Sequence, residues 1–205
     1  MNYLEFRNRF FDLACFSNHQ VYTWHPDFDR NNLSRWVNKG LLIRLKQGFY
    51  TFPEYLEKSG YAFFFANRIY NPSYISLHSA LAFYGLIPEL VAQVTSVTTL
   101  KTASFENSAG FFSYKSIREN LMFGYEMRTL TDERPVRFAS PEKALLDLLY
   151  LYPFYDTSEE MEALRLDDSF LQTDLNKELI RDYCKAFKSK AMLKRGELLL
   201  KTYNL

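Results

Sequence analysis

Residues 31–50, NNLSRWVNKGLLIRLKQGFY, decide the expected fold. Leu33, Trp36 and Val37 stand at positions i, i+3 and i+4, so a helix would place them on one apolar face. Asp29 is an expected N-cap, and Gly40 stands where a helix commonly ends in a glycine with positive φ. The first part of the stretch therefore predicts a short amphipathic helix over residues 29–38.

A two-stranded hairpin is expected directly after this helix. Apolar and basic residues alternate over residues 43–46, and Gln47-Gly48 is a suitable two-residue turn. The expected register pairs Leu45 with Tyr50 and Ile43 with Phe52 on the inner face, and Arg44 with Thr51 and Lys46 with Phe49 on the outer face. A helix followed by a hairpin with a basic tip is typical of the DNA-reading half of a winged helix-turn-helix.

The distribution of charge is more informative than its total. The chain has 205 residues, 47% of them hydrophobic, and a formal net charge of +1. Residues 30–53 contain five basic residues and no acidic one, whereas residues 156–168 are almost entirely acidic among their charged positions. Cys15 and Cys184 are expected as reduced core residues. We find no signal peptide and no long apolar run, which predicts a cytoplasmic protein with no membrane contact.

The predicted fold class is α+β, in four consecutive regions. Helices over residues 3–13, 18–24 and 29–38, with the hairpin, form an N-terminal winged helix-turn-helix over residues 1–53. Residues 54–70 are expected as a linker or transitional helix. Residues 71–155 are expected as an α+β domain with a mostly antiparallel sheet, and residues 156–205 as a helical C-terminal region with a basic face.

The elements of the middle region follow from caps and β-branched runs. A helix over residues 73–84 is predicted from Pro72 at its first turn and Gly85 at its end. Strands are predicted over residues 94–100, 110–117, 123–130 and 136–139, with turns at 107–110 and 131–135. Ser140-Pro141 predicts the start of another helix.

The candidate DNA contacts lie off the apolar face of the 29–38 helix and on the hairpin. Arginine and asparagine can make paired hydrogen bonds to guanine and adenine edges in the major groove, and hairpin cations can meet phosphates. The candidate residues are Arg30, Asn31, Asn32, Ser34, Arg35, Asn38, Lys39, Arg44, Lys46 and Gln47. A solvated polar helix face is the structural alternative.

Catalytic motifs are weak in this chain. The three histidines show no zinc-ligand spacing, and neither a phosphate-binding glycine loop nor a nucleophile elbow is present. No metal and no cofactor is therefore expected. Glu142, Lys143 and Asp147 carry the residue types of a metal-dependent nuclease, but they fall on one predicted helix. Their simpler interpretation is an acid at a helix start plus an i, i+4 ion pair.

Four blocks of sequence, in order, resemble the AbiEi antitoxin family of bacterial abortive-infection systems. They lie at residues 33–50, at 71–89 (NPSYISLHSALAFYGLIPE), at 94–99 (VTSVTT) and at 141–150 (PEKALLDLLY). The resemblance implies a non-enzymatic autorepressor whose winged helix binds the promoter of its own operon. It also implies a C-terminal domain that counteracts a nucleotidyltransferase-like toxin, with or without a stable complex.

Three functions remain open from the sequence. The leading hypothesis is a DNA-binding repressor and antitoxin. The second is a protein-interaction module in which the N-terminal unit serves as a scaffold. The third is a nuclease that uses Glu142, Lys143 and Asp147.

Overall fold

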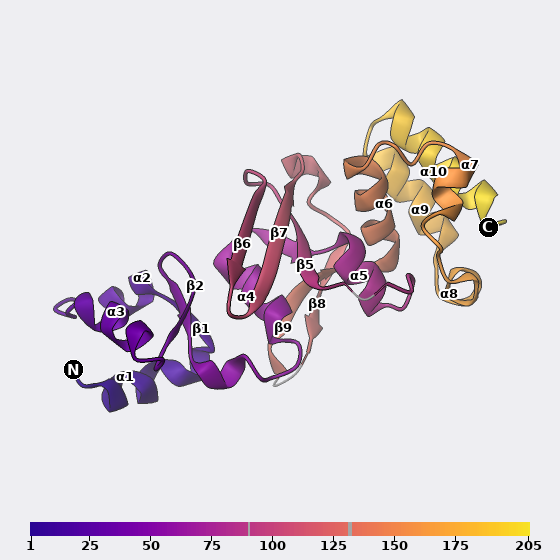
Figure 1. Cartoon of the computed structure of the whole chain (residues 1–205). Helices are drawn as coiled ribbons and strands as arrows, with labels where there is room; N and C mark the ends of the chain where they lie inside the picture. Colours follow the sequence, from indigo (N-terminus) through magenta and orange to yellow (C-terminus); the bar gives the residue numbers. More distant parts are fainter. Residues whose placement is uncertain (90, 131–132) are drawn as a thin grey trace.

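The computed structural model describes residues 1–89, 91–130 and 133–205. These residues form an α+β structure with one three-stranded and one six-stranded sheet. An N-terminal unit, the larger sheet and a group of C-terminal helices follow one another in a row, so that the two termini lie at opposite ends (Figure 1). None of the helices in the described ranges is both long and apolar enough to cross a bilayer.

The N-terminal unit contains the predicted helices and hairpin, with one further strand. Strand β3 lies in the middle of the small sheet, antiparallel to both neighbours, in the order β1-β3-β2. The unpredicted strand β1 is only three residues long and is recognisable only through its pairing with β3. The elements are α1 (Tyr3–Phe10), the 3-10 turn η1 (Phe11–Leu13), β1 (Cys15–Ser17), α2 (Asn18–Trp24), α3 (Asn31–Asn38), β2 (Ile43–Lys46) and β3 (Phe49–Thr51).

Local capping sets the ends of these helices. The Ser17 hydroxyl accepts a hydrogen bond from the Gln20 amide, and the Gln20 side chain accepts one from the Ser17 amide. Gly40 has φ of +69°, and the amides of Gly40 and Leu41 donate to the carbonyls of Val37 and Trp36. This is a Schellman ending, and it confirms the expected stop at Gly40.

The predicted hairpin register is wrong over most of its length. Lys46 pairs with Phe49 as expected, but a bulge between Arg44 and Lys46 shifts the remaining pairs to Arg44 with Tyr50 and Ile43 with Thr51. The extra residue is Leu45, whose side chain is buried. A bulge leaves one residue unpaired while the strand continues, and this lets Leu45 remain in the core.

The larger sheet is mixed rather than mostly antiparallel. Its order is β6-β7-β5-β4-β9-β8, and the β5·β7 and β4·β9 pairs are parallel while the other three are antiparallel. The strands are β4 (Ser73–Ile75), β5 (Gln93–Thr98), β6 (Ala103–Asn107), β7 (Gly110–Ser116), β8 (Tyr125–Thr129) and β9 (Pro135–Ala139). Four were predicted; β4 and β6 were not. The expected turn at 131–135 falls partly on residues 131 and 132, which lie outside the described residues.

The expected helix over residues 73–84 is wrong in its first turn. Residues Ser73–Ile75 form β4 in the middle of the sheet, and the helix α5 (Leu77–Phe83) begins only after Ser76. Ser73, Tyr74 and Ile75 are all fully buried. A strand buried on both faces shows no alternation of polar and apolar residues, so its pattern cannot be separated from a buried helix by spacing alone.

The remaining helices cover the sheet and close the C-terminal end. Helix α4 packs on strands β4, β5 and β9, and α6 packs on α5 and α9. Both cysteines are buried and free. These elements are η2 (Pro53–Tyr55), α4 (Tyr61–Ile69), η3 (Glu119–Leu121), α6 (Pro141–Leu151), α7 (Ser158–Glu162), α8 (Asp168–Thr173), α9 (Lys177–Ala186) and α10 (Lys190–Thr202).

The packing of α9 on α10 predicts the effect of a small substitution. A Cβ added to the buried Gly196 would overlap the sulfur of Cys184. We expect Gly196→Ala to lower the free energy of unfolding by roughly 1–2 kcal/mol, because overpacking costs about 1–3 kcal/mol and the gain in helix propensity offsets about 1 kcal/mol. Urea denaturation measures this, and Cys184→Ala/Gly196→Ala should be more stable than Gly196→Ala. A single variant as stable as the parent chain would contradict the close approach of the two helices.

Candidate nucleic-acid interface

The two faces of α3 differ completely in character. Leu33 and Trp36 are 2% and 6% exposed, and the Trp36 ring lies 4.7 Å from that of Phe6 in α1. The opposite face is exposed and polar, and it is formed by Arg30, Asn31, Ser34, Arg35, Asn38 and Lys39. We call these six residues the α3 outer face. The apolar spacing read from the sequence therefore orients the helix as expected.

The N-terminus of α3 is held by Asp29. Its carboxylate accepts a hydrogen bond from the Asn31 amide at 3.0 Å, and its carbonyl accepts one from the Asn32 amide. The cap residue itself is Arg30, which makes no side-chain capping bond. The N-cap prediction is thus displaced by one residue, although Asp29 does satisfy a free amide of the first turn.

The cations of the α3 outer face have no acidic partner among the residues that the structure describes. Arg35 donates to the Asn32 side chain at 2.9 Å, and the Arg30 guanidinium lies 5.0 Å from the centre of the Tyr22 ring. Within the described part of the chain, no carboxylate forms an ion pair with Arg30, Arg35 or Lys39. Unpaired cations on a rigid helix retain their full attraction for an anionic surface.

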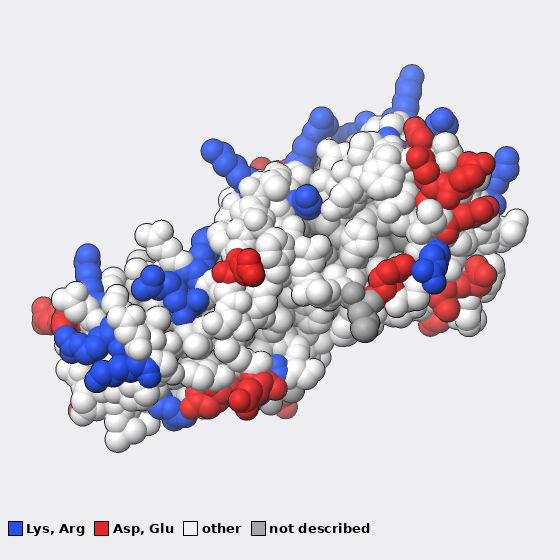
Figure 2. Space-filling view, in the orientation of Figure 1, with Lys and Arg blue, Asp and Glu red and all other residues white. Residues whose placement is uncertain are grey.

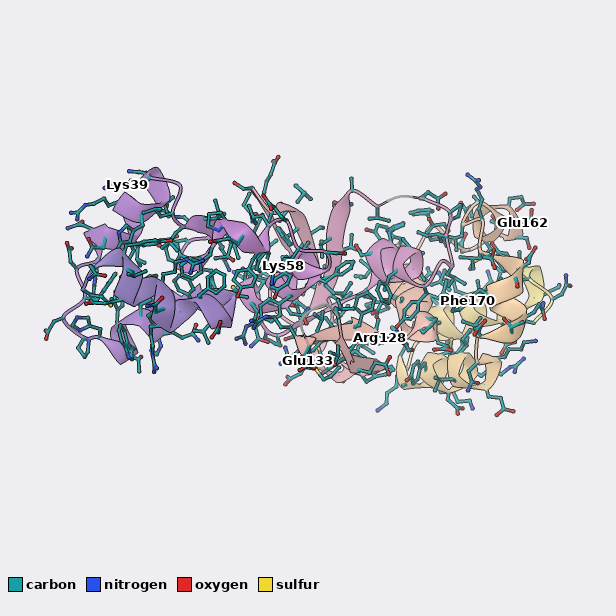
Figure 3. The ribbon with its side chains drawn as sticks, turned by 90° about the horizontal axis from the view of Figure 1, so that it is seen from below. Lys39, Lys58, Arg128, Glu133, Glu162 and Phe170 are labelled. Atoms are coloured by element: carbon teal, nitrogen blue, oxygen red, sulfur yellow. The ribbon has the colours of Figure 1, made fainter. Side chains whose placement is uncertain are left out.

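The figures place this face at one end of the molecule. Lysine and arginine side chains gather on one part of the N-terminal unit, whereas the opposite end of the molecule shows acidic side chains together with further cations (Figure 2). Lys39 lies on the N-terminal unit, far from the labelled Glu162 and Phe170 of the C-terminal helices (Figure 3). The net charge of +1 therefore conceals a local cluster of cations on the N-terminal unit.

The hairpin contributes only part of what was predicted. Arg44 and Gln47 are exposed. Lys46, expected to face outward, instead faces the larger sheet: its Nζ donates to the Ile69 carbonyl at 3.1 Å and lies 4.6 Å from the centres of the Tyr70 and Phe105 rings. Burial lowers the pKa of Lys46 below its usual value. Sequence alternation could not reveal this contact, because the partners lie more than twenty residues away.

A buried polar cluster lies in the part of the chain beyond the N-terminal unit, which comprises the larger sheet and the helices around it and which we call the second unit. Lys143 and Asp147 form the expected i, i+4 ion pair, and both side chains are fully buried. Tyr74 and Ser76 each donate to Asp147 Oδ2 at 2.8 Å. The Lys143 ammonium also lies over the Phe123 ring, 4.8 Å from its centre. Two hydroxyl donors and a cation therefore satisfy a carboxylate that has no access to water.

Ionisation of this pair is opposed by burial. Burial lowers the pKa of Lys143 and raises the pKa of Asp147, and the mutual attraction of the two groups counteracts both shifts. The sequence predicted the pair from its spacing, but it did not predict the roles of Tyr74 and Ser76, which are about seventy residues away. Their proximity follows from the central position of β4.

Glu142 does not join Lys143 and Asp147 in a common site. Its carboxylate accepts a hydrogen bond from the Asn176 amide at 2.9 Å, at the N-terminal end of α9. The interpretation of Glu142 as an acid at a helix start is confirmed, since it lies in the first turn of α6. In residues 1–89, 91–130 and 133–205, no three His, Cys, Asp or Glu side chains are placed to hold a metal ion together.

Comparisons with known proteins add no family assignment. No protein-family model matches the chain, and no curated protein matches its sequence. The resemblance to the AbiEi antitoxins therefore stays a prediction that rests on the four quoted blocks.

The buried pair predicts a large difference between two lysine substitutions. We expect Lys143→Met to lower the free energy of unfolding by about 3–5 kcal/mol, because it leaves the Asp147 charge buried without its cation. The matched control is Lys185→Met, which removes an exposed i, i+3 partner of Asp182 and should change stability by less than about 0.5 kcal/mol. Denaturant unfolding compares the two.

A second substitution tests the cause of that loss. Asn at position 147 keeps an oxygen for Tyr74 and Ser76 but carries no charge. Lys143→Met/Asp147→Asn should therefore recover part of the stability lost in Lys143→Met. Equal losses for Lys143→Met and Lys185→Met would show that the pair is not buried as described.

Proposed function

We propose that this chain is a DNA-binding transcriptional regulator whose residues 1–53 form a winged helix-turn-helix. The observation that carries the proposal is the α3 outer face, a polar and cationic helix surface without acidic partners in the described chain. The proposal assigns α3 as the recognition helix and the β2–β3 hairpin as the wing.

The order of elements supports this assignment. Helix, strand, two helices and a hairpin follow one another, and β3 lies between β1 and β2. In helix-turn-helix proteins the second helix of the motif enters the major groove while the first crosses the backbone. Here α2 and α3 occupy these positions, and the Trp36 contact with Phe6 fixes α3 against the core.

The chemistry of the α3 outer face suits the edges of bases. Arg30 and Arg35 carry the paired donors that match guanine, and Asn31 and Asn38 carry the donor and acceptor that match adenine. The hydrogen bond between Arg35 and Asn32 restricts the arginine before DNA binds, which reduces the entropy lost on binding. Ser34 lies between the arginines and asparagines and can donate to a phosphate or a base.

The wing contributes through Arg44 and Gln47 rather than Lys46. Arg44 is exposed on β2, and Gln47 is exposed in the turn. Lys46 is held between two aromatic rings and a carbonyl of the second unit. The proposed interface is therefore Arg30, Asn31, Asn32, Ser34, Arg35, Asn38, Lys39, Arg44 and Gln47, with Lys46 as a contact between the two units.

The operon context is proposed from the sequence resemblance alone. It makes the chain the autorepressor of its own operon and the antitoxin of a nucleotidyltransferase-like toxin. The DNA-binding face lies in the first 53 residues, so neutralisation of a toxin would be carried by the rest of the chain. The alternative, in which the N-terminal unit is only a scaffold for a protein-interaction module, predicts no DNA binding at all.

Substitutions on α3 and the wing should weaken DNA binding in different ways. We expect Arg35→Ala to reduce affinity for the region upstream of the chain's own coding sequence by about 1–3 kcal/mol, the value of a lost base contact. Arg44→Ala should reduce the magnitude of the slope of log K against log salt concentration by about 0.9, because one phosphate contact is lost. Fluorescence anisotropy at several salt concentrations measures both quantities.

Lys46→Met is the matched control for the wing. Because Lys46 already contacts the second unit, its replacement should leave the salt dependence unchanged. If Arg35→Ala and Arg44→Ala bound the duplex as tightly as the parent chain, the assigned face would be wrong. If Lys46→Met lost as much salt dependence as Arg44→Ala, the assignment of Lys46 to the junction would be wrong.

The antitoxin role can be separated from DNA binding in the full chain. The test co-expresses the product of the adjacent gene with a variant in which Arg30, Arg35 and Arg44 are replaced by alanine. We expect this variant to lose DNA binding and still to protect the cells, because protection is assigned to residues beyond 53. Loss of protection at an equal level of folded protein would contradict that separation. An adjacent gene product without toxicity would contradict the antitoxin role while leaving DNA binding standing.

A further inference from the structure

A cleft of about 680 Å³ lies where the N-terminal unit meets the second unit. Cys15, Gln20 and Phe49 of the N-terminal unit line one side. Helix α4 and strands β8 and β9 supply most of the remaining walls. Its volume is in the range of small-molecule sites. Its residues belong to neither the α3 outer face nor the buried cluster of Lys143 and Asp147.

The described residues that line the cleft carry a net positive charge. Arg68, Arg134 and Arg137 line it, and Glu133 is the one acidic residue of its lining in the described chain, which gives 3 − 1 = +2. Arg134 has a structural role, since it donates to the Tyr61 hydroxyl at 3.0 Å and to the Asp12 carbonyl at 2.6 Å. It thereby joins the two units beside the cleft.

The other two arginines retain unused donors. Arg137 uses one nitrogen on the Asn71 side chain, at 2.6 Å, and Arg68 lies 5.4 Å from the centre of the Phe64 ring. In the described part of the chain, neither arginine forms an ion pair with a carboxylate. Guanidinium groups with free donors on a concave surface suit a phosphate group.

A buried amide in the same wall also lacks a partner. Asn67 is 7% exposed, and its Oδ1 accepts a hydrogen bond from the Arg137 amide at 2.6 Å. This bond fixes the orientation of the Asn67 side chain, so that its Nδ2 group is the end of the amide not used by Arg137. Nδ2 is buried and finds no hydrogen-bond partner among the described residues. A buried donor without a partner is costly unless a ligand or water supplies an acceptor.

The remaining surface of the cleft is largely apolar. Phe49, Phe64 and Met127 line it, and Met127 is 58% exposed despite its large apolar side chain. Burial raises the pKa of the Cys15 thiol to about 12, so this sulfur adds a neutral surface. Aromatic and thioether groups beside guanidinium and amide groups can hold a flat heterocycle at one end and an anion at the other.

We propose that this cleft binds a nucleotide, with its phosphates on Arg68 and Arg137 and its base against Phe49, Phe64 and Met127. Gln20 and Asn71 supply further amide groups for the sugar or base. The inference is independent of the DNA-binding proposal, because a different surface carries it.

Isothermal titration of the full chain tests the proposal. The probes are ADP, GDP, CDP and UDP. Pyrophosphate and the four free nucleosides are titrated separately, to represent the anionic part and the base with its sugar. We expect at least one diphosphate to bind one to one, and more tightly than either of its halves. Arg68→Gln and Arg137→Gln should each weaken that binding by about 10- to 100-fold, the effect of losing a charged hydrogen bond.

Arg118→Gln is the matched control, because Arg118 is exposed and lies outside the cleft. It should leave nucleotide affinity unchanged. Arg68 is exposed as well, so Arg68→Gln tests the site even if Arg137→Gln impairs folding. Failure of all four diphosphates to bind, or binding unaffected by Arg68→Gln, would overturn the proposal.

A DNA-binding measurement distinguishes a nucleotide from the backbone of duplex DNA as the source of the phosphate group in the cleft. In the absence of nucleotide, Arg68→Gln and Arg137→Gln should bind duplex DNA as tightly as the parent chain. If they lost as much DNA affinity as Arg35→Ala, the cleft would be a contact for the DNA backbone and the nucleotide assignment would fall. Loss of DNA binding in Arg35→Ala alone would leave the nucleotide site intact.

Discussion

The N-terminal unit depends on the aromatic cluster around Phe6. This side chain is fully buried, and its ring centre lies 4.7 Å from those of Phe10 and Trp36 and 5.7 Å from that of Phe28. Edge-to-face and offset aromatic pairs add specific geometry to the burial of a large apolar area. Because Trp36 belongs to α3, the cluster sets the rotation of that helix about its axis. The polar residues between the core positions are thereby exposed as one continuous surface.

Polar contacts join this unit to the larger sheet. Lys46 Nζ reaches the Ile69 carbonyl, Asn107 Nδ2 donates to the Leu45 carbonyl at 2.8 Å, and Arg134 donates to the Asp12 carbonyl. Each bond ends on a backbone carbonyl, so the contacts depend on backbone position more than on the partner side chain. They leave the α3 outer face clear of the second unit, and the proposed nucleotide cleft lies beside them. Two separate surfaces can therefore exist in one chain whose formal net charge is only +1.

Sequence reasoning succeeded where the determining contacts are local. The stop at Gly40 and the spacing of Leu33 and Trp36 each depend on residues within a few positions, and both appear in the structure. It failed where a distant partner decides. The strand at Ser73–Ile75 exists through pairing with β5 and β9.

Long-range contacts also account for the errors in the candidate site. The alternation of apolar and basic residues could not show that Lys46 contacts Ile69 and Phe105, nor that a bulge retains Leu45 in the core.

Photo-crosslinking from position 34 tests most directly the central claim that the α3 outer face binds DNA. A crosslinking amino acid replaces Ser34 and, as a control, the exposed Leu193 of α10. The account predicts crosslinks to duplex DNA from position 34 and none from position 193. DNA binding that gives no crosslink from position 34, or equal crosslinks from both positions, would contradict it.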